Sequence, residues 1–513
     1  MSEEKKGDWQ PHANPWIIAL VVTSAAFMEI LDTTIVNVSI RHIAGGMSVS
    51  YDNATWTMTA YLVANGIVLT ISGWLSKVFG RKRYFMICLG MFTVSSVLCG
   101  LSTNLAELVL MRAVQGFFGG GLQPTQQAIL LDSFKPADRG KAFGMTAVAT
   151  VVAPAIGPTL GGWITDNYSW PWIFFINLPV GIAALFAVMQ VIEDPPWAKS
   201  KGLQSVDVTG ICLITLGLGC LQVTLDRGED EDWFGSSFIR ITAALAVVGL
   251  AGTVAWLLYA KKPVINIRVL KDRNFAMASI LMATMAALLY GSAVLLPELA
   301  QEVLGYTATL AGLILSPGAV LLVFLIPVVV FLQKTVPVKY IILTGFLILG
   351  ASMIYCQRLP PDISFGELVF MRAFQSAGLA FLFAPLTTIA FVNISRENSG
   401  DASALFTMFR NVSGSIGISI VTSQIIERTQ IRSAHLAART SLLDQGYGIV
   451  AQQAQRTLGA AGAGQLYQAF VKQAAILAYS DIFIYAGIGA LCVAPVALLL
   501  TSKKAGGQPN AAH

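Results

Sequence analysis

Long apolar runs are the feature that most constrains this chain. A membrane-spanning helix needs about 20 mostly apolar residues, and the sequence holds fourteen such runs between short polar stretches. Charged residues are only 12% of the 513 residues, whereas soluble domains average about 25%. The sequence therefore predicts an all-α polytopic membrane protein. The expected spans are 16–40, 54–76, 84–102, 106–131, 142–165, 172–192, 208–225, 238–260, 275–298, 308–333, 338–357, 366–391, 402–426 and 478–501.

The basic residues predict an orientation, because Lys and Arg accumulate in cytoplasmic loops. If both tails are cytoplasmic, twenty-one of the 33 Lys and Arg residues lie in inner loops and tails and four in short outer loops. We therefore expect a multi-pass membrane protein with both termini in the cytoplasm. This placement also explains the net charge of +5, so we expect no nucleic-acid partner.

One nine-residue segment occurs twice in the sequence, and we call it the doubled phrase. The letters ELVLMRAVQ at 107–115 return as ELVFMRAFQ at 367–375, an offset of 260 residues that later pairs Gly157 with Gly417. Eight spans separate the copies, and this even number gives both the same direction through the bilayer. Parallel repeats of this kind are one of the two transporter architectures. The sequence therefore predicts two six-helix halves with two further spans inserted between them.

The repeat sets the predicted boundaries of the domains. They are an N-terminal tail at 1–15, a first half at 16–195, an inserted two-helix hairpin at 196–262, a second half at 263–501 and a C-terminal tail at 502–513. Within the second half, the segment 427–477 is rich in Ala and Gln and has helical apolar spacing. We expect it to form a helical insertion in the periplasm.

Ionisable side chains inside the spans are candidate functional groups, because each costs free energy in lipid and usually faces a cavity or a partner. Glu29 and Asp32 are three residues apart on one helix face. Two carboxylates on one face oppose each other's ionisation, so this pair is a candidate proton site. Arg112, in the first copy of the doubled phrase, is the expected partner that tunes the carboxylate. Structural ion pairing and snorkelling of the arginine to the interface are the alternatives.

Three more ionisable residues are candidates for the substrate cavity: Arg372 in the second copy, Arg410 in the thirteenth span and Glu298 after Pro297. Chemistry of an enzymatic kind is not expected, because no nucleophile with a base, metal-ligand cluster or phosphate loop appears. The six cysteines are scattered singly, which gives no disulfide or zinc pattern.

Two further stretches are candidate gating and packing elements. Ala153, Gly157 and Gly161 form a ridge of small residues that permits close helix packing, and Pro154 and Pro158 bend the same helix. A purely structural ridge is the alternative. In the loop after the second span, the glycines frame a short basic connection, GWLSKVFGRKR at 73–83. The residues of this loop considered for gating are Gly73, Gly80 and Arg81.

These residues resemble the major facilitator superfamily, in particular its 14-span drug:proton antiporter branch and, within it, the EmrB-like multidrug exporters. The resemblance covers nearly the whole chain. LDTTIVNVSI at 31–40 is similar to the span-1 signature, GWLSKVFGRKR to the loop motif and LVLMRAVQGFFGG at 108–120 to the span-4 motif, which includes Gln115. APAIGPTLGG at 153–162, which ends on Gly162, is similar to the span-5 motif of exporters. Lys77 departs from the pattern, because an acidic residue usually stands there.

The resemblance implies a major facilitator fold and a proton-coupled secondary-active multidrug exporter of the bacterial inner membrane, of the kind that confers antibiotic resistance. It implies amphipathic or lipophilic drugs and protons as the transported species, no cofactor, and a periplasmic adaptor with an outer-membrane channel as partners. A substrate-specific exporter of a lipid or metabolite shares every one of these features and stays open as an alternative. A channel or a membrane receptor is more remote, because the two halves carry isolated and dissimilar charges.

Overall fold

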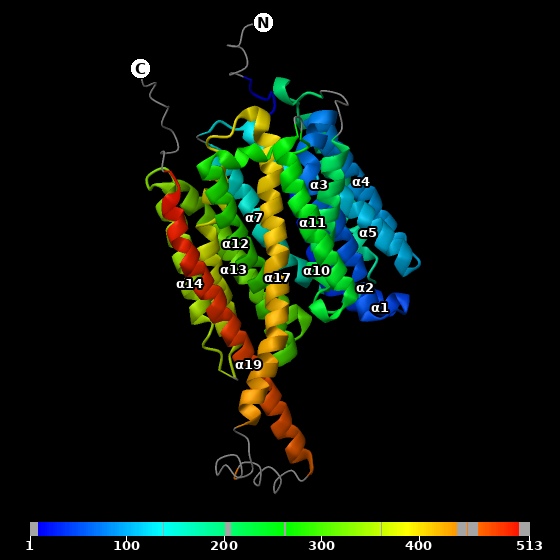
Figure 1. Cartoon of the computed structure of the whole chain (residues 1–513), viewed down its shortest axis with the longest axis vertical. Helices are drawn as coiled ribbons and strands as arrows, with labels where there is room; N and C mark the ends of the chain where they lie inside the picture. The colour runs from blue at the N-terminus through cyan, green and yellow to red at the C-terminus, as the bar shows by residue number, and fades with distance from the viewer. Residues whose placement is uncertain are drawn as a thin grey trace.

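Fourteen helical spans cross the molecule. The structure is a computed structural model that describes residues 9–136, 138–200, 207–260, 263–360, 362–438, 449 and 460–501. In these residues all regular structure is helical, and fourteen spans are long and apolar enough to cross a membrane, which confirms the predicted number. The first span begins, and the last ends, at the end of the bundle that carries both chain termini (Figure 1). We call this end the termini face and the opposite end the far face.

The first half contains six spans, three of them built from two helices each. Its helices are α1 (Pro15–Met47), α2 (Tyr51–Ala54), α3 (Trp56–Phe79), α4 (Arg81–Leu101), α5 (Leu105–Gly119), α6 (Leu122–Ser133), α7 (Arg139–Asn167), α8 (Trp172–Phe175) and α9 (Asn177–Val191). The fourth span is interrupted at Gly120 and Gly121, between α5 and α6. The glycines fit here because a Cβ on Gly120 would lie 2.4 Å from the Asn65 carbonyl oxygen of α3.

The second half repeats this order. Its helices are α12 (Arg273–Glu298), α13 (Ala308–Leu332), α14 (Val338–Tyr355), α15 (Phe365–Ala380), α16 (Phe383–Ala390), α17 (Ser399–Ala437) and α19 (Ala460–Val493), which continues into the 3-10 helix η7 (Ala494–Leu499). Helices α5 and α15 begin 260 residues apart, as do α7 and α17. The packing repeats too, since α1 packs on α7 as α12 packs on α17.

Helices α17 and α19 extend beyond the rest of the bundle at the far face (Figure 1). In the described part of the segment 427–477, the chain continues these two span helices, α17 to Ala437 and α19 from Ala460. The last span therefore belongs to a helix that starts well before the predicted residue 478. Residues 439–448 and 450–459 of the expected insertion, and the tails 1–8 and 502–513, lie outside the described residues.

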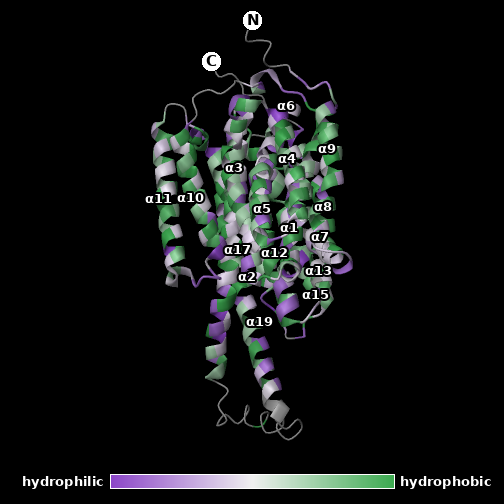
Figure 2. Cartoon of the chain, turned by 90° about the vertical axis from the view of Figure 1, so that its right-hand side faces the viewer, coloured by the Kyte–Doolittle hydropathy of each residue, from purple (hydrophilic) through white to green (hydrophobic). Residues whose placement is uncertain are grey.

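The inserted pair is a hairpin of α10 (Val208–Arg227) and α11 (Ser237–Tyr259) at one edge of the bundle (Figure 2). Its helices touch at Gly217 and Gly249, where a Cβ on Gly249 would lie 2.5 Å from the Gly217 Cα. Helix α10 is attached to both halves. Gln222 donates to the Ser415 hydroxyl of α17 at 3.1 Å, and α10 also accepts a hydrogen bond from Thr59 of α3.

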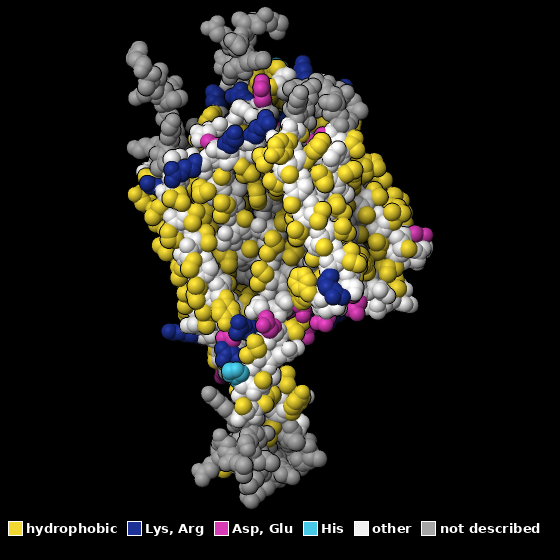
Figure 3. Space-filling model, viewed as in Figure 1, with side chains coloured by type: hydrophobic (Ala, Val, Ile, Leu, Met, Phe, Trp, Pro, Cys, Tyr) yellow, Lys and Arg dark blue, Asp and Glu magenta, His cyan; other side chains and the backbone are white. Residues whose placement is uncertain are grey.

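The surface has the polarity that a bilayer requires. Hydrophobic side chains cover the lateral surface between the two faces (Figure 3). The span helices in Figure 2 carry hydrophobic residues over most of their length. Lys and Arg side chains gather at the termini face, and most of the visible acidic side chains lie near the far face (Figure 3). Apolar side chains therefore face lipid over the height of the bundle, whereas charge is kept to its two ends.

Candidate functional site

Asp32 forms a fully buried ion pair with Arg112. The Nη1 of Arg112 donates to Asp32 Oδ2 at 2.6 Å, and neither side chain is more than 1% exposed. Gln115 and Asn177 donate to the other carboxylate oxygen at 3.0 and 2.7 Å. The guanidinium also stacks on the Tyr61 ring, 4.1 Å from its centroid. The structure thus brings three predicted candidates, Asp32, Arg112 and Gln115, into direct contact.

Glu29 lies one turn away on α1 in a different environment. The Tyr61 hydroxyl and the Asn65 amide donate to Oε1 at 3.2 and 3.0 Å, and the Gln123 amide donates to Oε2. These donors are all neutral, and no ion pair of Glu29 is recorded within the described residues. The two carboxylates therefore differ: a proton on Asp32 breaks an ion pair, whereas a proton on Glu29 meets only neutral groups.

Gln123 links Glu29 to the second half of the molecule. While its amide donates to Glu29, its carbonyl oxygen accepts from Nη2 of Arg410 on α17. One turn along α6, Gln127 accepts from the Thr407 hydroxyl at 3.4 Å. All of these side chains are buried. A continuous chain of polar contacts therefore runs from the carboxylate in α1, through α6, to an arginine in α17.

The small-residue ridge of α7 packs on α1 directly beside the carboxylates. A Cβ on Gly157 would lie 2.1 Å from the Thr34 hydroxyl oxygen, and one on Gly161 would lie 3.1 Å from the Ile35 carbonyl oxygen. No larger residue fits at Gly157 without moving α1 or α7. The position of the ridge thus fixes the distance between α7 and the helix that carries Glu29 and Asp32.

The other predicted residues of the ridge have different surroundings. Ala153 is fully buried, and Pro154 and Pro158 lie inside the helix, where each removes one backbone hydrogen bond. At Gly162, no described atom lies within 4 Å of an added Cβ. On its other side α7 meets α13, since a Cβ on Gly312 would lie 2.7 Å from the hydroxyl of Thr159. Helix α7 therefore touches both α1 and, through α13, the second half.

Lys77 contacts α17 at the termini face. Its Nζ lies 2.6 Å from Oδ2 of Asp401, a buried carboxylate in the first turn of α17. Gly73, one turn earlier in α3, permits this approach, because its Cβ would lie 2.8 Å from Asp401 Oδ1. The usual acid of the loop motif is thus replaced by a base, and its partner on α17 is an acid. A negative charge at the start of a helix is itself favourable.

The loop residues Gly80 and Arg81 fix the connection after α3. Gly80 has a φ of +85°, a conformation that glycine adopts at little cost. The guanidinium of Arg81 is buried, forms an ion pair with Asp132 of α6 and donates to the Ser399 hydroxyl at 2.9 Å. Because Ser399 begins α17, this contact also joins the two halves. Polar contacts therefore hold the two halves together at the termini face.

The remaining candidates lie in the second half. Arg372 is buried on α15 beside Gln375, to which it donates at 3.3 Å. Glu298 is the last residue of α12 and is half-buried near the far face, where Glu302 pairs with Arg41 of α1 at 3.4 Å. No hydrogen bond or ion pair within the described residues joins Glu298 or Arg372 to the cluster around Asp32.

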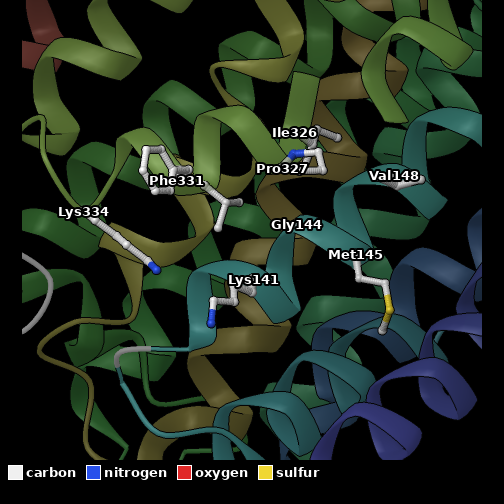
Figure 4. A pocket seen from close by; sticks show the side chains of 9 residues that line it. Lys141, Gly144, Met145, Val148, Ile326, Pro327, Phe331 and Lys334 are labelled. Carbon is white, nitrogen blue, oxygen red and sulfur yellow. The ribbon is translucent and has the colours of Figure 1, made fainter. Parts of the chain in front are cut away.

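A cavity of about 410 Å³ lies between α7 and α13, at their ends near the termini face (Figure 4). Its walls are mostly apolar: Met145 and Val148 of α7 face Ile326 and Val330 of α13, with Gly144, Pro327 and Phe331. Lys141 and Lys334 lie at one end of the cavity, away from Val148 and Ile326 (Figure 4). The cavity therefore offers an apolar compartment with two amines at one end, between the two halves.

Sequence reasoning missed the amides that hold the two carboxylates: Asn65, Gln123 and Asn177. One signal was present. The fourth span carries Gln123, Gln126 and Gln127 at helical spacing within an otherwise apolar run, which places amides on one face. No sequence signal identified Asp401 as the partner of Lys77, because the two residues are more than three hundred positions apart.

Comparison with known proteins places these features in a family. The profile of the Major Facilitator Superfamily matches residues 22–418. The multidrug export protein EmrB of Haemophilus influenzae is 36% identical over 82% of each chain. Its namesake in Escherichia coli K12 is 33% identical over 97% of this chain and 98% of its own. The fatty acid resistance protein FarB of Neisseria gonorrhoeae is 32% identical over 94% and 95%.

The fold has a match among solved structures as well. The human organic anion transporter MFSD10 (TETRAN) superposes with a TM-score of 0.58 and 12% identity, covering 94% of this chain and all of that one. At this identity the match concerns the fold alone. It agrees with the helical architecture of this chain. The chain therefore belongs to the Major Facilitator Superfamily, as its profile match over residues 22–418 shows.

Proposed function

We propose that the chain is a proton-coupled exporter of amphipathic drugs that works by alternating access between its two halves. The relatives at 32–36% identity are named for multidrug export and fatty acid resistance, and their names supply the substrate class of the proposal. The proton gradient is the only energy source that the proposal needs. It invokes no cofactor or metal, and the described residues contain no group of metal-ligating side chains.

The proposed orientation places the termini face in the cytoplasm of a bacterial cell. Its support is the accumulation of Lys and Arg at that face (Figure 3), because basic residues are retained on the cytoplasmic side. In this orientation the ion pair of Lys77 with Asp401 and the contact of Arg81 with Ser399 close the cytoplasmic side. The carboxylates then take their proton from the periplasmic side.

The chain of contacts from Glu29 through Gln123 to Arg410 carries the coupling proposal. We assign the transported proton to Glu29, because its direct partners are all neutral. A protonated carboxyl group becomes a hydrogen-bond donor on one oxygen, so it no longer accepts there from the Gln123 amide. Gln123 then reorients, and its hydrogen bond with Arg410 breaks. Protonation in the first half thus loosens a contact with the second half.

Asp32 has a different role in this proposal. Its ion pair with Arg112, supported by Gln115 and Asn177, holds α1, α5 and α9 together. The α7 ridge against Thr34 keeps the same part of α1 in place. We propose that this cluster moves as one body with the first half, while the contact between Gln123 and Arg410 opens and closes.

Two matched glutamines test the coupling proposal. Gln123→Leu removes the link between Glu29 and Arg410. Gln126→Leu removes a buried glutamine of the same helix whose amide donates, among the described residues, to Thr23 and Thr146 of the first half. A hydrogen bond to a charged group contributes about 1.5–3 kcal/mol. In proteoliposomes we therefore expect Gln123→Leu to lower gradient-driven dye transport roughly tenfold or more, and Gln126→Leu to lower it less. Equal losses in the two variants would remove the support for the link.

Amphipathic compounds need access from the inner leaflet, and the cavity between α7 and α13 fits that need. It is apolar, opens between the halves and has Lys141 and Lys334 at one end. Val148→Trp fills the cavity, whereas Val247→Trp on α11 places the same ring on a lipid-facing surface. We expect only the first to raise the KM for a lipophilic dye in inverted vesicles. A drug panel tests the alternative: if the unsubstituted protein transports a single compound of the panel, that result favours a substrate-specific exporter.

The extension of α17 and α19 beyond the far face is the proposed contact with a periplasmic adaptor, which would connect to an outer-membrane channel (Figure 1). Tyr467 and Val471 are exposed on this part of α19. Exposed aromatic residues are typical anchors of protein interfaces. If an adaptor binds there, Tyr467→Asp lowers its co-purification with the transporter, while transport by the purified protein in proteoliposomes stays unchanged.

A further inference from the structure

The two copies of the doubled phrase make the same contacts in the two halves, with one chemical difference. In the first half, Arg112 donates through Nη1 to Asp32 at 2.6 Å and to Gln115 at 2.7 Å. In the second half, Arg372 donates through Nη1 to the Ser292 hydroxyl at 3.1 Å and to Gln375 at 3.3 Å. Ser292 lies 260 residues after Asp32, so it occupies the repeated position of the carboxylate. The second arginine therefore has a hydroxyl where the first has a negative charge.

The charge of Arg372 lacks the other compensation that Arg112 has. Arg112 stacks on Tyr61 and donates from Nε to a backbone carbonyl oxygen. Arg372 is only 4% exposed, its Nε has no hydrogen-bond partner, and within the described residues no ion pair or stacked ring is recorded for it. Arg410, the third arginine inside a span, at least contacts Glu29 through one intervening glutamine.

A second unpaired donor lies beside this arginine. Ser376 is buried one helical turn after Arg372 on α15, and its hydroxyl has no hydrogen-bond partner in the part of the chain that the structure describes. Both side chains face Gly318 of α13, where an added Cβ would lie 2.5 Å from Ser376 Oγ and 3.2 Å from Arg372 Cγ. Two buried donors without partners thus lie on one face of α15, opposite a residue that has no side chain.

An isolated buried charge costs several kcal/mol, and native proteins normally compensate it with a counter-charge. A guanidinium matches the planar geometry of a carboxylate and also binds small inorganic anions. We propose that Arg372 and the hydroxyl of Ser376 form a site for one small monovalent anionic group. Ser292 lies beside this site, and its own hydroxyl donates to the backbone carbonyl oxygen of Leu289 at 3.1 Å. The anion takes the position that the Asp32 carboxylate has in the first half. Its source is either a free inorganic anion or the carboxylate of a transported compound.

The site is tested on purified protein in detergent, without any gradient. Thermal unfolding is followed in sodium chloride and in sodium acetate, against the sodium salt of the bulky sulfonate MES at equal ionic strength. A ligand at ten or more times its Kd shifts the midpoint of a chain of this length by about 1–3 °C. We expect a saturable rise of this size in the wild-type protein. A response to chloride identifies a free anion, and a response to acetate alone identifies a carboxylate.

Two substitutions assign the response to this site. Ser292→Asp supplies the carboxylate of the first half, so we expect a higher midpoint in MES and at least a tenfold weaker response to the small anion. Ser279→Asp is its control. Ser279 is, like Ser292, a buried serine of α12, but among the described residues its hydroxyl has no hydrogen-bond partner. With no arginine to pair with the new carboxylate, this change is expected to lower the midpoint. Arg372→Gln removes the charge and is expected to abolish the response, which keeps the test open if Ser292→Asp fails to fold.

The proposal is overturned if neither anion raises the midpoint above the MES value, or if the rise persists in both Ser292→Asp and Arg372→Gln. For the carboxylate source, the inference rests on the proposed exporter function. The two are distinguishable, because the unfolding experiment needs no transport. Its failure leaves gradient-driven export untouched, and loss of gradient dependence in vesicles leaves the anion response untouched.

Discussion

Breaking the buried pair of Asp32 with Arg112 has a cost that the structure allows us to estimate. Asp32→Asn removes the negative charge but keeps the shape of the side chain. The guanidinium of Arg112, which is only 1% exposed, then has no counter-charge. Removing one partner of a buried ion pair costs about 3–5 kcal/mol. Arg112→Gln leaves the opposite charge unpaired, with the amides of Gln115 and Asn177 as its remaining donors.

The assay is the unfolding midpoint of the purified protein in detergent. With an unfolding entropy of about 2.1 cal/mol/K per residue, a loss of 1 kcal/mol lowers the midpoint of a chain of this size by roughly 1 °C. We therefore expect Asp32→Asn to lower the midpoint by about 3–5 °C. Arg372→Gln is the matched control, because it removes a buried arginine that has no ion pair among the described residues. In the MES salt we therefore expect its midpoint to fall less than that of Asp32→Asn, or not at all.

The double variant is the decisive member of this set. With Asn at position 32 and Gln at position 112, no unpaired charge remains in the pair. The loss is then smaller than the sum of the two single losses, since contacting residues couple by about 0.5–3 kcal/mol. If the two losses simply add, or if Asp32→Asn has the stability of the wild type, the ion pair does not have the energetic role that its geometry indicates.

Two further predictions concern the contacts between helices. Gly157→Val adds a Cβ 2.1 Å from the Thr34 hydroxyl oxygen, and we expect it to lower the free energy of unfolding by about 1–3 kcal/mol. Gly162→Val has open space around its Cβ, and we expect it to change the free energy of unfolding by less than about 0.5 kcal/mol. Equal unfolding midpoints for the two variants would contradict this packing. Lys77→Asp places a second negative charge against Asp401 and is expected to lower transport. Adding Asp401→Lys to the same chain restores opposite charges and is expected to restore transport. If this charge swap does not restore dye efflux, the pair does not close the termini face.

The spans and the repeat were predictable because both can be read from the letters of the sequence, without knowing which helices are in contact. The length of each apolar run gives a span, and the offset between the two copies of the phrase gives the halves. The contact of Asp32 with Arg112 was expected as a neighbouring charge, and the structure shows it as a direct bond at 2.6 Å. Helix periodicity also placed the small-residue ridge of α7 on one face, although it does not identify α1 as the partner helix.

The unpredicted part of the site depends on how the helices are rotated against one another. Nothing local in the sequence shows that Gln123 reaches both Glu29 and Arg410, since these residues belong to three spans. From the sequence, Lys77 was only a departure from the family pattern, in which an acidic residue stands at this position. In the structure it is a contact of reversed polarity, because Asp401 of the second half supplies the acid.

The central claim is that protonation of Glu29 controls the conformational change of alternating access, between the state open to the cytoplasm and the state open to the periplasm. The most direct measurement compares Glu29→Gln with the wild type in proteoliposomes, once with an imposed proton gradient and once for exchange of labelled against unlabelled drug at equal pH. Glutamine imitates the protonated carboxyl group and cannot release a proton. We predict that Glu29→Gln loses gradient-driven accumulation but keeps drug exchange. Gradient-driven accumulation at the wild-type rate in Glu29→Gln would contradict the account.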